Sequence, residues 1–279
     1  MTATLERLVR YPVKSLDPEE VDEARLADRG ALAGDREFAV VDAPADAAHD
    51  PAAASVSGDG DYVNGKRTRA VHRLRSSVDR ERGTLSLRVH GEDETHTFDL
   101  GDRTALNEWL SDYFGTPVSV RREAAGGYPD DRDSSGPTVV SAATLRETAS
   151  WFSGVDAGEM RRRLRPNLVV GGVPAFWEDR LYADRGDVVR FTVGGVRFEG
   201  VSPCARCVVP SRDPDTGAET EGFRETFIEK RRETRPPWLA SDRFDHDYRL
   251  MVNTRVPESE WGKTLSVGDP VEILGTVPE

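Results

Sequence analysis

Short runs of alternating hydrophobic and polar residues fill the first part of this 279-residue chain. Between residues 84 and 89, Leu85, Leu87 and Val89 alternate with polar side chains, as a half-buried strand requires. Similar runs, bounded by turn-forming residues, predict further strands at residues 5–13, 21–26, 38–41 and 74–78. Residues 1–120 are therefore predicted to form a small β-rich unit.

One helix interrupts these strands. Asp102 can cap its N-terminus, and Gly115 followed by Pro117 ends it. Its apolar positions recur at helical spacing, at Leu106, Trp109, Leu110 and Tyr113. We expect this stripe to pack into the core of the unit.

The second part of the chain mixes strands with a few helices. Ser141 can cap a helix, a basic helix ends at Arg165-Pro166, and another is predicted at residues 223–232. Strands are predicted at residues 167–170, 188–193, 196–198, 248–254 and 271–274. The fold class is therefore α+β, mainly β with a few helices.

Two segments are too polar and too rich in small residues to form part of a core. Residues 43–60 are predicted to be a mobile surface loop. Residues 124–137 have the Gly, Ser, Pro and Asp content of a connection between domains. We therefore predict a boundary near Glu123, with domains at 1–122 and 123–279.

The charge of the chain disfavours polyanionic partners. Acidic residues outnumber basic ones by 50 to 38, a net charge of −12, which disfavours nucleic acid and anionic membranes. Only four of the basic residues are lysines, Lys14, Lys66, Lys230 and Lys263. An acidic, arginine-rich surface suits a concentrated-salt cytoplasm, where charge repulsion is screened. A coding bias toward arginine is the alternative explanation.

The sequence also predicts a soluble, cytoplasmic protein. The opening residues lack the basic and apolar regions of a secretory signal, and no apolar run approaches the roughly 20 residues that span a bilayer. Two cysteines are too few for a disulfide framework, for an iron–sulfur cluster or for a structural zinc site. We expect any electrons to come from outside the chain.

Both cysteines lie in Ser202-Pro-Cys-Ala-Arg-Cys207. Arg206 can favour a thiolate at Cys207, and one thiolate is enough for a soft metal if a cofactor supplies the other ligands. Burial as two small hydrophobic residues is an equally good interpretation of the spacing. Disulfide exchange needs a helix after the motif, and Val208-Val-Pro210 is a poor helix start.

Other polar residues fall at the ends of predicted elements. Lys14 and Arg36 could clamp an anion together, and an ordinary solvated pair is the alternative. Arg165 and Asn167 lie where a helix gives way to a strand. Three further segments are not expected to bind a ligand. Asp213-Pro-Asp-Thr-Gly217 is predicted to be a turn that supports its loop. Arg161-Arg-Arg163 is predicted to be a solvated helix face, and Asp245-His-Asp247 a polar surface.

Taken together and in order, several motifs resemble the MOSC family, named for the molybdenum cofactor sulfurase C-terminal domain. They are Tyr11-Pro-Val-Lys-Ser15, Gly34-Asp-Arg36, Arg165-Pro-Asn167, Glu178-Asp-Arg180, Cys204-Ala-Arg-Cys207, Asp213-Pro-Asp-Thr-Gly217 and Val267-Gly-Asp-Pro-Val271. The resemblance covers nearly the whole chain. It implies a MOSC-type β-barrel domain preceded by a smaller β-barrel-like N-terminal module.

Within that family the chain is most similar to the mitochondrial amidoxime-reducing component and its bacterial relatives. That resemblance implies Mo-molybdopterin as cofactor, with Cys207 as the catalytic residue and metal ligand and Cys204 secondary. The residues implied to bind the pterin and its phosphate are Lys14, Ser15, Arg36, Arg165, Asn167 and Arg206. Ser141 and Thr144, at the start of a helix, are also implied to bind the cofactor. The implied reaction is reduction of a small N-hydroxylated substrate, with electrons from a ferredoxin- or flavoprotein-type reductase.

Two other functions stay open. The chain could carry molybdenum cofactor or sulfur without turnover, or it could exchange disulfides through Cys204 and Cys207. Compared with the family, we expect no ferredoxin domain, no pyridoxal-phosphate desulfurase domain and no membrane anchor.

Overall fold

A computed structural model describes residues 2–43, 62–131, 133–239 and 241–279. The predicted loop at 43–60 lies almost wholly outside the described residues. Most of the elements are strands, which confirms the predicted α+β class. The strands are β1 Thr4–Arg10, β2 Glu19–Val21, β3 Glu23–Arg25, β4 Phe38–Asp42, β5 Leu74–Asp79, β6 Thr84–Val89, β7 Thr95–Asp99, β8 Val118–Arg122, β9 Gly136–Ser141, β10 Leu168–Gly171, β11 Asp187–Val193, β12 Val196–Ala205, β13 Arg249–Arg255, β14 Thr264–Ser266 and β15 Val271–Pro278. The α-helices are α1 Thr104–Phe114, α2 Ala142–Ser150, α3 Ala157–Leu164 and α4 Phe223–Thr234.

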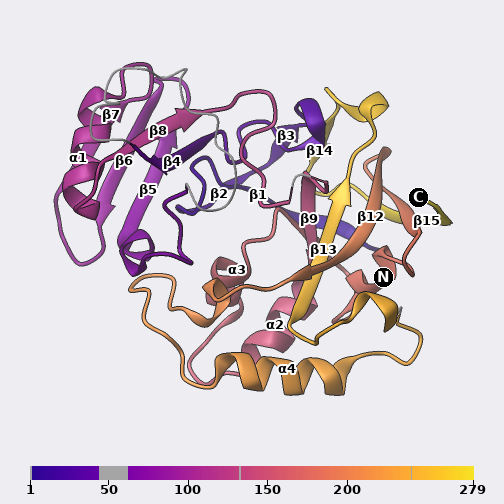
Figure 1. The fold of residues 1–279 in the computed structure, drawn as a ribbon. Helices are drawn as coiled ribbons and strands as arrows, with labels where there is room; N and C mark the ends of the chain where they lie inside the picture. Colours follow the sequence, from indigo (N-terminus) through magenta and orange to yellow (C-terminus); the bar gives the residue numbers. More distant parts are fainter. Residues whose placement is uncertain (1, 44–61, 132, 240) are drawn as a thin grey trace.

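The larger body is built on an eight-stranded sheet with the order β15-β11-β12-β13-β9-β10-β1-β2. β9 and β10 run parallel, and the other neighbours in this sheet are antiparallel. Aromatic and aliphatic residues such as Leu8, Phe191 and Phe198 form a core along this sheet. A second core, which includes Met160 and Phe227, lies among α2, α3 and α4. Figure 1 shows these three helices together below the larger sheet.

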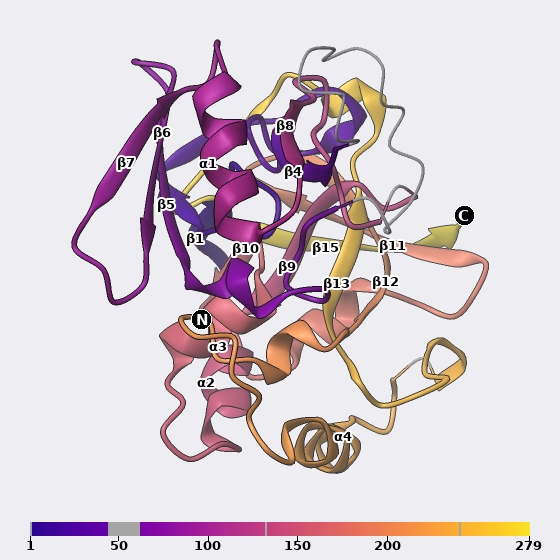
Figure 2. The same cartoon turned by 60° about the vertical axis from the view of Figure 1, so that its left-hand side comes forward.

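The smaller body contains β4 to β8 and α1. β5, β6 and β7 form an antiparallel sheet, and β4 pairs with β8. Leu85 and Leu87 from β6 pack with Leu106 and Leu110 from α1 in one core. The helix ends at Gly115, which takes a left-handed conformation with φ of 67°. Figure 2 shows this body beside the larger sheet and above α2 and α3.

The N-terminal strands belong to the larger sheet. β1 pairs with β10, with Leu5 opposite Val170 and Leu8 opposite Leu168. Strands of this sheet therefore lie on both sides of the predicted boundary near Glu123. β9 falls at the end of the segment predicted as a connection, so the strand at Gly136–Ser141 was not anticipated. None of the described helices has the length and hydrophobicity needed to cross a membrane.

Candidate functional site

A cavity of about 480 Å³ lies between the two bodies. Its wall combines the chain after β1 and the start of β5 with the end of α3, the end of β12 and part of β13. Its volume is in the usual range for small-molecule and cofactor sites. Six of the nine predicted site residues line it, namely Lys14, Ser15, Arg36, Arg165, Arg206 and Cys207.

Uncommon backbone conformations gather around this cavity. Among the described non-glycine residues with positive φ, four line its wall: Ser15, Arg36, Arg165 and Met251, with φ between 49° and 72°. Side chains other than glycine pay a steric cost in this region, and such residues cluster at ligand sites. Met251 lies where β12 and β13 lose regular register. The backbone here is shaped for the cavity rather than for regular pairing.

The two thiols have different surroundings. Cys204, at the end of β12, is 5% exposed, and its Sγ donates to Asn253 Oδ1 at 2.7 Å. Burial raises the pKa of the Cys204 thiol to about 12. Cys207 lies beyond the strand, is half-buried and lines the cavity, and neither cysteine forms a disulfide. Cys207 is therefore the better placed of the two to bind a ligand.

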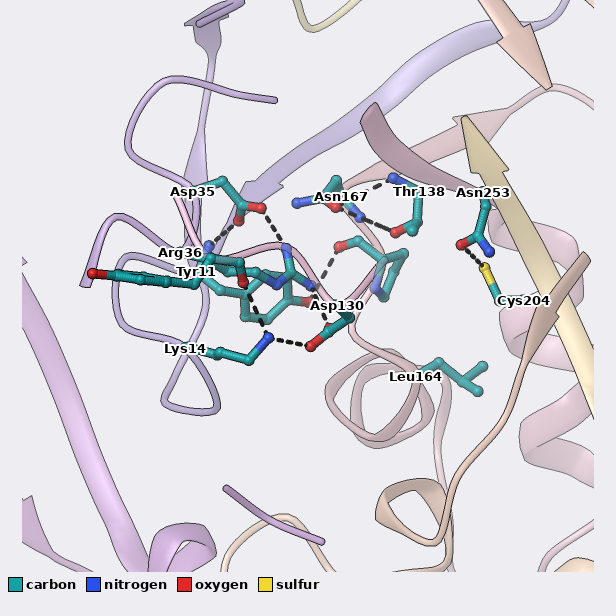
Figure 3. Close-up of polar contacts among 12 residues, drawn as sticks. Tyr11, Lys14, Asp35, Arg36, Asp130, Thr138, Leu164, Asn167, Cys204 and Asn253 are labelled. Carbon is teal, nitrogen blue, oxygen red and sulfur yellow. Dashed lines mark hydrogen bonds and ion pairs between the residues drawn. The ribbon is translucent and has the colours of Figure 1, made fainter. Parts of the chain in front are cut away.

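Lys14 and Arg36 lie together, as predicted, but carboxylates accompany them. Lys14 Nζ is 2.5 Å from Asp130 Oδ1, and Arg36 Nη2 is 3.5 Å from Asp130 Oδ2 (Figure 3). Arg36 Nη1 also pairs with Asp35. Partial desolvation favours the neutral acid, but the charges of Lys14 and Arg36 outweigh it and hold the pKa of Asp130 below its usual range. The Asp130 side chain is 69% exposed and is therefore a displaceable partner.

Arg165 is a cation without an acidic partner. It ends α3 in the left-handed region, and its guanidinium lies over the Tyr11 ring. Its Nη2 atom is buried without a hydrogen bond, and no described carboxylate forms an ion pair with it. Burial, with a smaller effect from the nearby charge of Arg36, lowers the pKa of Arg165. A partly buried guanidinium with an unpaired nitrogen can bind an anion that enters the cavity.

Arg206 precedes Cys207 and closes the wall between α3 and β13. Its Nη2 donates to Leu164 O at 2.9 Å, at the C-terminus of α3, where a cation is favoured. Its Nη1 atom contacts Met251 Sδ at 3.7 Å, and its Nε is buried without a partner. One donor of Arg206 is therefore still available next to Cys207.

The structure does not bring Ser141, Thr144 and Asn167 to this cavity. Ser141 accepts from Thr144 N at 3.0 Å as the N-cap of α2, and Thr144 Oγ1 donates to Glu178 Oε2 at 3.0 Å. Asn167 Nδ2 donates to Val9 O at 3.0 Å, which ties β10 to β1. All three side chains are buried. Asn167 borders only a smaller adjoining cavity.

The basic residues on α3 are more buried and more fully paired than the sequence predicted. The expectation of a solvated face is wrong for Arg163, which is 3% exposed and donates to Pro210 O at 2.9 Å. Arg162 binds both carboxylate oxygens of Asp215 at 2.6 and 2.9 Å, and Arg75 reaches the same carboxylate at 2.7 Å. The Asp213–Gly217 turn is thereby fixed to both bodies.

Several cavity residues were missed by the sequence reasoning, namely His72, Arg75, Asp130, Arg162 and Arg212. For the three arginines the only signal was the high arginine content of the sequence, which does not show which arginines pair with carboxylates. His72 and Asp130 gave no signal. Within the described residues, no group of three or more His, Cys, Asp and Glu side chains is placed to hold a metal ion. A metal at Cys207 would therefore need most of its ligands from a cofactor.

The fold and the cavity define a β-rich protein with a pocket that is lined by several cationic side chains and also presents a thiol. Family models match two successive domains, the MOSC N-terminal beta barrel domain over residues 2–117 and the MOSC domain over residues 138–272. The chain belongs to the MOSC family.

Similar curated proteins include molybdenum cofactor sulfurases. The one from Caenorhabditis briggsae is 29% identical over 122 residues, 43% of this chain and 16% of that protein. The one from Bos taurus is 21% identical over 166 residues, 50% of this chain and 18% of that protein. These matches span less than a fifth of the relatives. The crystal structure of the YUAD protein from Bacillus subtilis aligns with 98% of this chain and 96% of its own, at 15% identity and a TM-score of 0.37.

Proposed function

We propose that this protein is an oxidoreductase that binds Mo-molybdopterin in the cavity, with Cys207 as the metal ligand, and reduces small N-hydroxylated substrates. One observation carries the proposal most directly. Cys207 shares a single cavity with Arg165 and Arg206, two arginines with buried nitrogen atoms that lack hydrogen-bond partners. Membership of the MOSC family and similarity to molybdenum cofactor sulfurases point to the same cofactor.

The residues fit the cofactor in charge and in ligand type. Its phosphate requires cations, which Lys14, Arg36 and Arg165 supply at one side of the cavity. A soft metal bound by the sulfur atoms of the pterin takes a protein thiolate readily, and Cys207 is the accessible one. A single protein ligand is consistent with the absence of a larger ligand cluster among the described residues.

The cofactor would supply two-electron redox chemistry at the metal, and an external ferredoxin- or flavoprotein-type reductase would replace the electrons. The residues of this chain would bind and orient it. Lys14 and Arg36 would exchange Asp130 for the phosphate, Arg165 would gain its missing anion, and the remaining Arg206 donor would hydrogen-bond the cofactor beside Cys207.

Disulfide exchange is the less favoured alternative. A resolving thiol must ionise and be accessible, whereas Cys204 is buried, donates its hydrogen to Asn253, and has a pKa raised to about 12. Cys204 is therefore poorly suited to act as the resolving thiol for Cys207. Cofactor or sulfur carriage without turnover is distinguished from reduction by experiment.

The test compares Cys207→Ser with Cys204→Ser as the matched control, both purified from a host that makes the molybdenum cofactor. Molybdenum is measured by elemental analysis, pterin by fluorescence after oxidation, and turnover with benzamidoxime and a chemically reduced viologen. We expect Cys207→Ser to lose turnover and most of its molybdenum, while Cys204→Ser keeps both.

Bound cofactor without turnover in the wild type would favour the carrier function. Equal loss in both variants, with no dependence on molybdenum, would favour disulfide exchange. A wild-type protein free of molybdenum and pterin would overturn the proposal. Circular dichroism of each variant checks that the fold is retained.

A further inference from the structure

A further cation without an acidic partner lies in the same cavity. Arg212 follows Cys207 by five residues on the same segment and lines the wall. Its Nε and Nη1 atoms are buried without hydrogen bonds, and it forms no ion pair with any described carboxylate. Arg75 and Arg162, which line the same wall, both bind Asp215. Arg212 is thus in a different electrostatic state from its neighbours.

The backbone that carries Arg212 is fixed. Arg212 N donates to Val209 O at 3.0 Å, and the turn that follows is closed by Asp213 Oδ1, which accepts from Thr216 N at 2.8 Å. Beyond it, Asp215 is held by arginines from β5 and α3. Because both flanks are fixed, the guanidinium is presented to the cavity by a rigid support, as a binding residue requires.

The charge of Arg212 affects the protonation of a neighbouring imidazole. His72 lines the same wall, and burial lowers the pKa of its imidazole, with further lowering by the charges of Arg212, Arg165 and Arg75. A neutral His72 offers hydrogen bonds without competing for an anion. In a chain with a net charge of −12, the unpaired guanidinium makes this wall a local anion site.

We propose that Arg212 binds an anionic group of the substrate, so that the preferred substrates are N-hydroxylated compounds that also carry a carboxylate or another oxyanion. This inference rests on the proposed function, because it concerns the substrate of the same site. In the proposed function the cofactor phosphate binds to Lys14, Arg36 and Arg165, so Arg212 is left for another anion. An additional phosphate on an extended cofactor is the other source of an oxyanion, and the test separates the two.

The probes are benzamidoxime, which is neutral, and 4-carboxybenzamidoxime, which adds one carboxylate. Wild type, Arg212→Gln, Arg212→Lys and Arg190→Gln are compared in the cofactor-loaded protein. Arg190 is a matched control, because it lies on β11 away from the cavity and pairs with Glu199 at 3.5 Å. Dissociation constants come from calorimetry, which does not depend on turnover, and KM and kcat come from viologen-linked assays.

A hydrogen-bonded ion pair contributes enough binding free energy for the wild type to bind the carboxylated probe about tenfold or more tightly than the neutral one. Arg212→Gln should abolish this preference while leaving benzamidoxime binding unchanged, Arg212→Lys should keep part of it, and Arg190→Gln should match the wild type. No preference in the wild type, or the same preference in Arg212→Gln, would overturn the inference.

The cofactor source is tested by acid hydrolysis of each protein and analysis of released nucleotide. Nucleotide that is present in the wild type and lost in Arg212→Gln would assign Arg212 to the cofactor and overturn the substrate assignment. The two proposals also fail separately. Selective binding of the carboxylated probe without reduction of either compound would contradict the proposed function and leave the anion site established.

Discussion

The guanidinium carbon of Arg165 lies 4.0 Å from the centre of the Tyr11 ring, and Tyr11 Oη donates to Pro166 O at 3.1 Å. Burial raises the pKa of Tyr11 to about 12, so the ring is neutral. An aromatic face attracts a cation without cancelling its charge. Tyr11 therefore holds Arg165 in place and leaves it able to bind an anion.

Arg165→Gln should weaken phosphate binding by about tenfold or more, because a hydrogen-bonded ion pair contributes on the order of 1.5–3 kcal/mol. Calorimetry of cofactor-free protein with inorganic phosphate measures the change. Tyr11→Phe keeps the ring and should bind phosphate nearly as the wild type does, whereas Tyr11→Leu should lose part of the affinity. Unchanged binding in Arg165→Gln would show that this cation is not in the phosphate site.

Asp130→Asn should have the opposite effect on phosphate binding. The Asp130 carboxylate pairs with Lys14 and Arg36, so an incoming anion must compete with it. Removing the charge should raise phosphate affinity several-fold in the same calorimetric titration, since an exposed ion pair contributes up to about 1 kcal/mol. Asp133→Asn changes an exposed carboxylate in the same loop and serves as the control. Equal gains in both variants would indicate a general charge effect.

Glu178→Gln should flatten the dependence of stability on pH. Burial, followed by the charge of Asp179, raises the pKa of Glu178 to about 7 from an ordinary 4.5. The folded state therefore keeps a proton that the unfolded state releases, and the free energy of unfolding falls as pH rises from about 4.5 through about 7. At about 1.4 kcal/mol per pKa unit, the loss is on the order of 3 kcal/mol.

Urea unfolding of Glu178→Gln between pH 4 and 8 measures this effect. Glu272→Gln, on the exposed face of β15, should retain the slope of the wild type. A wild-type slope in Glu178→Gln would mean that another group titrates over this range.

Molar potassium chloride should stabilise the protein. Fifty acidic against 38 basic residues leave net surface repulsion, which salt screens because the Debye length is about 3 Å at 1 M. We expect a higher Tm in molar potassium chloride than in dilute buffer, and slower or incomplete refolding in dilute buffer. Full stability in dilute buffer would support coding bias as the origin of the arginine content.

Local signals in the sequence predicted much of the fold. α1 ends at Gly115 as predicted, but its N-cap is Arg103 rather than Asp102, which lies one residue earlier and accepts from Thr104 N at 3.1 Å. β9 was missed because its Gly136-Pro137 start reads as a turn, and its strand character comes from pairing with β10 and β13. Neighbouring strands distant in sequence supplied what the local pattern lacked.

The candidate site was predictable only in part. The MOSC motifs identified Lys14, Arg36, Arg165 and Cys207, which the fold does bring to one cavity. Whether each arginine forms an ion pair was not predictable, because its carboxylate partner can lie far away in the sequence. Arg162 meets Asp215 across 53 positions, whereas Arg212, three residues before that carboxylate, remains without one.

β1 lies between β10 and β2, so a fragment without the N-terminal residues loses two strands of the larger sheet. A fragment that starts at the connection would leave the hydrogen-bonding edge of β10 open, and an open edge promotes aggregation. A synthetic peptide of residues 1–33 carries the missing strand and should bind such a fragment by strand addition. The same peptide carries Tyr11 and Lys14, so it would restore the part of the pocket wall that follows β1, whereas Arg36, His72 and Arg75 would still be missing.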